Sequence, residues 1–116
     1  MLTRTITYGI LIIQRGNNMT EKQLGTLVST NTIASMIEED SEFQNFIVKA
    51  FNRHCNDDWG ELCDEDKKLN DICLKQDEGR ILSRYTWKGE PIYIITELYG
   101  RSSEDNYTTI LLADEY

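Results

Sequence analysis

The densest group of chemically active side chains in this sequence lies between residues 57 and 66, where carboxylates fill six of ten positions. The segment reads Asp57-Asp58-Trp59-Gly60-Glu61-Leu62-Cys63-Asp64-Glu65-Asp66. Because carboxylates repel one another, a run of this density is typical of two situations. It is a solvated loop leading into a helix, whose first turn favours acidic residues, or it is an acidic face that meets a basic partner.

Trp59 and Gly60 stand in the middle of this acidic segment. A Trp at such a position either docks on the core as an anchor or projects as an aromatic contact ringed by carboxylates. The second arrangement suits the binding of an arginine-rich surface. The neighbouring Gly permits a sharp turn or a close approach of the backbone.

Histidine and cysteine chemistry is the first enzymatic possibility, since His54, Cys55, Cys63 and Cys73 are soft ligands and nucleophiles. None of the cysteine pairs has the short spacing that forms a zinc chelate turn. His54 and Cys55 are adjacent, so on a helix their side chains diverge by about 100°. Buried small hydrophobic side chains explain the cysteines better than a metal site or a Cys–His pair.

The carboxylates of the acidic segment supply many oxygen ligands but no recognised spacing. The EF-hand pattern is missing, and a weak divalent-cation site would rest on ligand number alone. Glycine-rich phosphate loops and the GxSxG motif are also absent from the sequence. We therefore predict a protein that is not an enzyme, with no catalytic residues, no metal and no cofactor.

The charge of the chain restricts its partners. Its 116 residues contain 12 basic and 20 acidic side chains, for a formal charge of −8. This sign opposes direct binding to nucleic acid or to an anionic membrane surface, and it favours cationic partners such as the basic groove of a nucleic-acid enzyme. Three cysteines, an odd number, and the lack of an evident secretory signal indicate reduced thiols and a cytoplasmic location.

The N-terminal residues raise a question of domain limits. Met19-Thr-Glu-Lys resembles a natural polar start, so residues 1–18 are expected to be an N-terminal extension. Alternatively, Thr5–Ile13 forms an extra strand at a sheet edge. Residues 19–116 are predicted to form a single α+β domain. An edge strand, either the one in 1–18 or the C-terminal one, offers a route to a homodimer.

Hydrophobic periodicity predicts the remaining elements. A strand near Leu24–Ser29 precedes a short helix over Thr32–Glu38. A longer helix begins at a Ser41/Gln44 capping box and carries an apolar stripe from Phe43 to His54. We expect a further helix from Asp64 to about Gln76, with Leu69, Ile72 and Cys73 facing the core and Gly79 as its C-cap. A hairpin of Arg80–Trp87 and Glu90–Leu98 should follow, with its turn at Lys88-Gly89. The last predicted strand covers Tyr107–Ala113.

This order predicts an α+β fold. An N-terminal strand and two to three helices come first, and a three-stranded antiparallel meander follows, with the helices packed on one face. Residues 99–106 are expected to form a polar loop between the last two strands.

Several segments together resemble a known group of proteins. They are His54…Asp58-Trp59-Gly60-Glu61-Leu62-Cys63, then Arg80-Ile81-Leu82-Ser83, then Ile94-Ile95-Thr96-Glu97, and Thr108-Thr109-Ile110-Leu111-Leu112…Asp114-Glu115-Tyr116. This pattern resembles a family of short proteins carried on plasmids, conjugative elements and phages of Gram-positive bacteria. Members tend to start near the position of Met19 and to have a shorter turn where this chain has residues 98–106.

The resemblance implies a setting rather than a reaction. Small acidic proteins of mobile elements often counter host defence. The expected function is therefore stoichiometric inhibition of a nucleic-acid-targeting defence complex, such as a Cas9-like CRISPR nuclease, by an acidic face that occupies its nucleic-acid-binding groove. The alternative is an accessory or regulatory protein that binds a partner encoded on the same element. The candidate contact residues are Asp57, Asp58, Trp59, Glu61, Asp64, Glu65 and Asp66, with Glu104 and Asp105 second.

Overall fold

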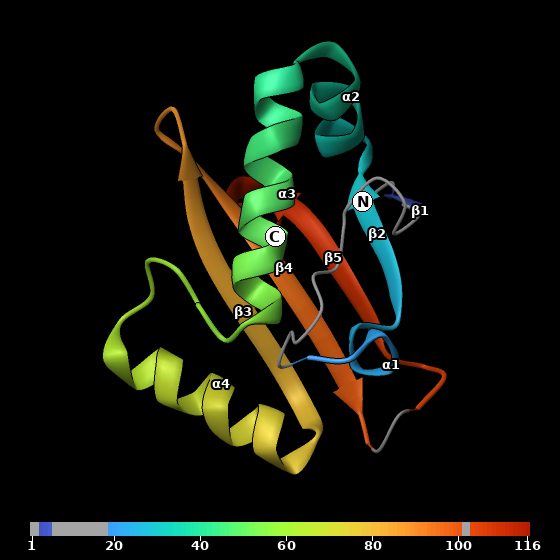
Figure 1. Ribbon diagram of the computed structural model, residues 1–116, viewed down its shortest axis with the longest axis vertical. Coiled ribbons are helices and arrows are strands. Elements are labelled where there is room, and N and C mark those ends of the chain that lie inside the picture. The colour runs from blue at the N-terminus through green and yellow to red at the C-terminus, as the bar shows by residue number, and fades with distance from the viewer. Residues whose placement is uncertain (1–2, 6–18, 101–102) are drawn as a thin grey trace.

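The computed structural model describes residues 3–5, 19–100 and 103–116 (Figure 1). Its strands are β1 (Thr3–Thr5), β2 (Thr26–Thr30), β3 (Glu78–Trp87), β4 (Glu90–Tyr99) and β5 (Tyr107–Leu112). Its helices are α1 (Glu21–Leu24), α2 (Asn31–Glu39), α3 (Ser41–Cys55) and α4 (Asp64–Gln76), and a 3-10 turn, η1, covers Ala113–Glu115.

The described strands form one sheet in the order β1-β2-β5-β4-β3. Strands β3, β4 and β5 are the expected antiparallel meander, but they are only part of the sheet. Strand β2 pairs with β5 in parallel, and β1 pairs with β2 antiparallel. The α+β class is thus confirmed, whereas the three-stranded description is wrong. A parallel pair needs a long crossover connection, and here the connection contains all the main helices.

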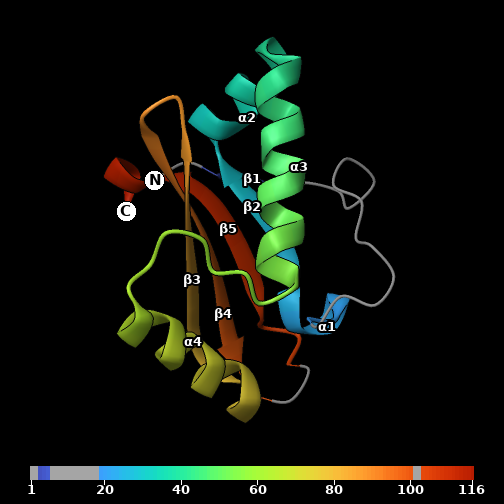
Figure 2. The same cartoon turned by 60° about the vertical axis from the view of Figure 1, so that its left-hand side comes forward.

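Helices α2 and α3 pack on one face of the sheet, while α4 lies beside β3 at the sheet edge (Figure 2). Helix α3 places Phe43, Ile47 and Phe51 in the core at helical spacing, as its apolar stripe predicts. Among the described residues, the 3-10 turn η1 lies on the side of the sheet away from α3 (Figure 2).

The start of α3 differs from the expectation. Asp40, not Ser41, is the N-cap, because its carboxylate accepts hydrogen bonds from the backbone N–H groups of Glu42 and Phe43. A carboxylate one residue earlier satisfies two unpaired backbone donors of the first turn and also interacts favourably with the helix dipole. The Ser41/Gln44 capping box is therefore wrong.

Helix α4 differs from the prediction in its C-cap residue and in the face that is buried. Asp77, with a φ of 57°, is its left-handed C-cap, and Gly79 already belongs to β3. Leu69 and Ile72 are exposed, whereas Asn70 is buried. The inward face of α4 is thus rotated from the one that the apolar spacing indicates.

The hairpin turn follows its sequence closely. Lys88 and Gly89 both have positive φ, 47° and 83°, as a two-residue type I′ turn requires. This turn sets the register of β3 against β4, in which Leu82 faces Ile95 and Arg80 faces Glu97.

An edge strand is present near the N-terminus at Thr3–Thr5, before the expected range of Thr5–Ile13. Residues 6–18, which carry most of that expectation, lie outside the described residues. Strand β5 lies between β2 and β4, so it offers no open edge for a homodimer. Of the two strands proposed for such pairing, only β1 remains, and the homodimer stays a prediction. In the described part of the chain, no helix is long and apolar enough to cross a membrane.

Candidate functional site

The first half of the acidic segment is built into the edge of the sheet. The backbone N–H of Arg84 donates to the Trp59 carbonyl at 3.2 Å, and the N–H of Glu61 donates to the Arg84 carbonyl at 2.8 Å. Gly60 thereby forms a parallel bridge with Arg84. Because edge strands expose unpaired backbone groups, this short addition protects part of β3 from pairing with another chain.

Gly60 is required by this arrangement. Its φ is 75°, and a Cβ atom at this position would lie 1.9 Å from the Arg84 carbonyl oxygen. No other residue can make so close an approach. The Trp-Gly pair of the sequence is therefore explained by contact with β3.

Asp58 holds the loop to helix α3. Its two carboxylate oxygens accept hydrogen bonds from Nε and Nη2 of Arg53, at 2.7 and 3.1 Å. The Arg53 guanidinium lowers the pKa of the Asp58 carboxyl below its ordinary value. The same carboxylate accepts the Gly60 N–H, and the Asp58 carbonyl accepts the Tyr85 hydroxyl at 2.7 Å.

Trp59 is an anchor rather than a projecting contact. Its ring is 3% exposed, and it packs edge-on against His54 with the centroids 5.7 Å apart. Its indole N–H donates to a carboxylate oxygen of Asp71 at 2.9 Å, which ties the loop to α4. The interpretation of Trp59 as an exposed hot spot is wrong, since burying a large ring against the core outweighs solvent display.

Asn70 is a structural residue that the sequence patterns do not reveal. Its side-chain amide donates to the Leu82 carbonyl at 2.8 Å, and its oxygen accepts the Leu82 N–H at 3.2 Å. One side chain thus replaces a neighbouring strand at this point of β3. A polar residue inside the apolar spacing of a helix is the signal that points to such a role.

The second half of the acidic segment is available at the surface. Asp64, Glu65 and Asp66 form the exposed first turn of α4. Among the described residues, no hydrogen bond or ion pair engages their carboxylates. The side chains of Leu69 and Ile72 follow on the same helix and are 59% and 51% exposed. We call this combination of three carboxylates and two apolar side chains the α4 surface.

The remaining predicted contact residues lie around this surface or away from it. Glu61 is exposed and accepts the Thr86 hydroxyl at 2.6 Å. Asp57 has a left-handed φ of 63° at the end of α3. Glu104 and Asp105 are exposed in the β4–β5 loop, which lies next to α1 and far from the start of α4 (Figure 1). The structure therefore does not join them to the α4 surface.

A buried chain of hydroxyl groups crosses the core through His54. Its Nδ1 lies 2.5 Å from the Ser83 hydroxyl, and its Nε2 lies 2.8 Å from the Thr96 hydroxyl. Thr96 in turn contacts the Thr108 hydroxyl at 2.8 Å, and Thr108 donates to the Leu24 carbonyl at 2.7 Å.

The end of this chain sets the direction of every proton in it. Since Thr108 donates to a carbonyl, it accepts from Thr96, and Thr96 must then accept from Nε2–H of His54. Nδ1 is left as an acceptor for Ser83. Complete burial lowers the pKa of His54 from 6.5 to about 3, so the ring is neutral and Nδ1 carries no proton.

The histidine and cysteines do not form a reactive group. Both ring nitrogens of His54 are occupied by hydroxyl groups. Cys55 is buried, and burial raises the pKa of its thiol to about 12, which disfavours the nucleophilic thiolate. Cys63 is exposed, and Cys73 is half-buried. Within the described ranges, no three His, Cys, Asp or Glu side chains gather as metal ligands would.

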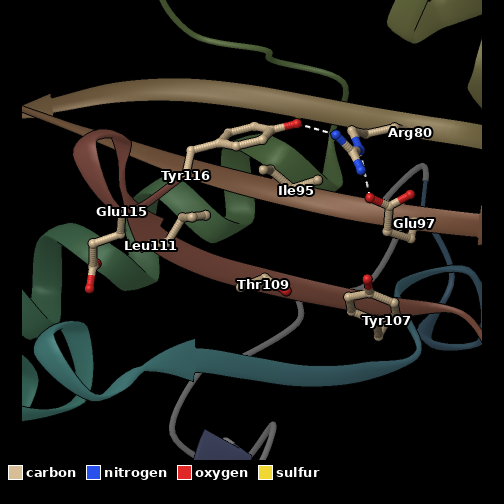
Figure 3. Close-up of a pocket in the computed structure, with 8 residues that line it drawn as sticks. All are labelled: Arg80, Ile95, Glu97, Tyr107, Thr109, Leu111, Glu115 and Tyr116. Carbon is tan, nitrogen blue, oxygen red and sulfur yellow. Dashed lines mark hydrogen bonds and ion pairs between the residues drawn. The ribbon is translucent and has the colours of Figure 1, made fainter. Parts of the chain in front are cut away.

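The open face of the sheet carries a second surface, a groove of about 160 Å³ (Figure 3). We call it the tyrosine groove. Ile95, Thr109 and Leu111 of β4 and β5 lie along it. Its other lining residues are Arg80, Glu97, Tyr107, Glu115 and Tyr116. The alternation of β4, in which Tyr93, Ile95, Glu97 and Tyr99 interleave with core residues, is the sequence signal for this face.

Arg80 lies at the centre of the polar contacts in this groove. Its Nε donates to the Glu97 carboxylate at 2.5 Å, and its Nη1 donates to the Tyr116 hydroxyl. Glu115 has a different role. Its carboxylate accepts the Thr30 hydroxyl and the Leu112 N–H, each at 2.9 Å, and so holds η1 against the sheet.

Comparison of the chain with protein-family models, with curated proteins and with solved structures finds no match. The function therefore has to be inferred from the α4 surface and the tyrosine groove.

Proposed function

We propose that this protein acts by binding, without catalysis, and that the α4 surface docks on a basic region of a nucleic-acid-targeting defence complex, such as a Cas9-like nuclease. The protein would then occupy a groove meant for nucleic acid and inhibit the complex in a stoichiometric manner.

The single observation that carries this proposal is the exposure of Leu69 and Ile72 beside Asp64, Glu65 and Asp66. Two large apolar side chains at helical spacing favour burial against another molecule. The carboxylates next to them are not used by the described part of the fold, so they remain free to attract a cationic partner. The overall charge of −8 acts in the same direction by steering association.

The structure also changes which residues should be tested. Reversing Asp58 would break its contacts with Arg53 and Gly60 and would disturb the loop itself. The triple variant D64N/E65Q/D66N removes three charges from the surface and leaves that loop intact. A matched control is E39Q/E42Q/E90Q, which removes three charges from exposed positions elsewhere.

The test is a titration of purified guide-loaded Cas9 with the protein, read as DNA cleavage and as binding affinity over a series of salt concentrations. We expect one protein per nuclease, and affinity that falls as salt rises. Three exposed ion pairs contribute about 1–2 kcal/mol together, so D64N/E65Q/D66N should weaken binding about tenfold. L69A/I72A should weaken it by a similar factor, while the control variant binds as the parent does.

Equal binding by D64N/E65Q/D66N, L69A/I72A and the control would contradict the proposed surface. No binding to Cas9 or to restriction enzymes would contradict the defence target, and the same variants would then be applied to proteins encoded on the same mobile element. Thermal melts of each variant distinguish lost contact from lost fold.

A further inference from the structure

We infer that the tyrosine groove binds an arginine side chain from a basic partner segment, and that Arg80 fills this position in the free protein. This inference rests on the proposed function, because it describes how the same partner would extend beyond the α4 surface.

The groove already displays the contacts that a guanidinium prefers. Arg80 meets a carboxylate through Glu97, a phenol oxygen through Tyr116, and the face of the Tyr116 ring at 5.6 Å from its centroid. Carboxylate, hydroxyl and aromatic face together make a favourable environment for arginine. Figure 3 shows the Arg80 side chain between Tyr116 and Glu97, with Tyr107 beside Glu97.

The groove is also more negative than a single ion pair would make it. It holds two carboxylates, Glu97 and Glu115, against one cation. Burial raises the pKa of the Tyr107 phenol, and the neighbouring Tyr99 and Glu97 raise it further. Glu97 is well covered, with 17% of its side chain exposed, whereas half of the Arg80 side chain is exposed. The carboxylate is thus the fixed part of the site, and the arginine is the exchangeable part.

The Arg80 side chain borders a second hollow, which it can enter when it leaves Glu97. This hollow of about 240 Å³ lies between α4 and β3 and is also lined by Leu62, Asp66, Leu69, Asn70 and Leu82. Asp66 supplies a carboxylate there. If an incoming arginine takes over Glu97, Arg80 can turn toward Asp66, and Asp64 and Glu65 are then the carboxylates of the α4 surface that meet the partner.

The two surfaces are continuous across the sheet. Leu69 and Leu82 line the hollow, and Leu82 is the register partner of Ile95, which lies in the tyrosine groove. A partner segment with apolar side chains and an arginine would therefore pass from Leu69 on α4 over Leu82 to Ile95 in the tyrosine groove. Its chemistry is that of a basic, partly apolar peptide, which matches the charge and the apolar floor of this strip.

The experiment is an NMR titration of the full-length, isotope-labelled protein with the capped peptide Ac-Leu-Arg-Ala-Leu-NH₂. The same peptide with citrulline, the neutral isostere of arginine, is the chemical control. We expect shifts at the amides of Ile95, Thr109 and Leu111 with the arginine peptide only. The variant E97Q should bind about fivefold more weakly, as the loss of one partly buried ion pair implies.

Replacement of Arg80 tests the exchange directly, through the affinity for the arginine peptide. R80Q should bind the arginine peptide about threefold more tightly, because the site no longer has an internal competitor. R84Q is the matched control, since it removes the same charge from the same face of β3 but not from the groove. R84Q should change affinity less than R80Q does.

The inference is overturned by equal binding of the citrulline peptide, by weaker binding of the arginine peptide to R80Q, or by the absence of shifts in the groove at about 10 mM peptide. Shifts confined to residues 61–72 would also overturn it while leaving the α4 surface in place. Failure of the proposed function is separate, because it is seen as loss of Cas9 binding by the parent protein.

Discussion

The buried His54 should make the stability of this protein fall in mild acid. Folding lowers the pKa of His54 from 6.5 to about 3 because the ring is fully buried. Below pH 6.5 the His54 ring binds a proton in the unfolded chain but not in the folded chain. The contribution of His54 to stability is therefore complete above pH 6.5 and is lost as the pH falls toward 3.

The magnitude follows from linkage. Each pH unit between these two pKa values lowers the free energy of unfolding by about 1.4 kcal/mol. From neutral pH to pH 4.5 the loss is about 3 kcal/mol, a large part of the roughly 5–15 kcal/mol typical of a domain. Carboxylates add a loss at lower pH, including that of Asp58, whose pKa is lowered by Arg53.

Urea unfolding at several pH values measures this effect. The variant H54Q keeps an amide that can reach the hydroxyls but cannot titrate, so the difference between the two pH curves isolates His54 from the carboxylates. We expect the difference to reach about 3 kcal/mol by pH 4.5. Parallel pH curves for the parent and H54Q would refute the reasoning.

A second readout does not depend on the variant. The sequence contains one histidine, so its ring signals are assigned without ambiguity in an untagged protein. The ring should carry its proton on Nε2 and should not titrate between pH 7 and pH 4.5. A folded-state titration near pH 6 would show that burial does not keep the ring neutral.

Three further predictions concern the acidic segment and its supports. G60A should destabilise the fold by more than about 3 kcal/mol, because a Cβ there would meet the Arg84 carbonyl, whereas G89A, also at positive φ but in open space, should cost only about 1–2 kcal/mol. Equal denaturant midpoints for the two variants would contradict the bridge to β3. N70A should lower the free energy of unfolding by about 1–3 kcal/mol and speed hydrogen exchange at the Leu82 amide, because that amide loses its side-chain acceptor. N45A, at an exposed position, is the control. Unchanged exchange in N70A would show that Asn70 does not protect this edge. A thiol reagent should label Cys63 in the native protein and Cys55 only on unfolding, and early labelling of Cys55 would contradict its burial.

Local patterns in the sequence predict most of the individual elements. The apolar stripe from Phe43 to His54 indicates α3, and Lys88-Gly89 indicates the hairpin turn, because both depend on neighbours within a few residues. The α+β class follows from the order of these elements. The parallel pairing of β2 with β5 does not follow, since it joins residues about eighty positions apart through tertiary packing.

The acidic segment shows the same division at the level of single residues. Its composition indicates a charged surface, yet Asp58, Trp59 and Gly60 are used to hold the loop against α3, α4 and β3. Asp64, Glu65 and Asp66 are exposed at the start of α4 and make no hydrogen bond or ion pair with the described part of the chain. A sequence pattern cannot separate these groups, because a carboxylate that pairs with Arg53 and one that faces solvent are the same residue type.

The sequence by itself determined the charge, the helical stripe, the hairpin and the α+β class of this protein, because each is a matter of composition or short-range periodicity. Tertiary structure alone decided that Leu69 and Ile72 face solvent and that Arg80 enters a tyrosine groove. The physical reason is that the hydrogen bonds of Asn70, rather than the apolar spacing of Leu69 and Ile72, determine which face of α4 packs inward. The Asn70 amide satisfies two backbone groups of an edge strand, and this requirement, invisible before β3 is placed, sets which face of α4 turns inward.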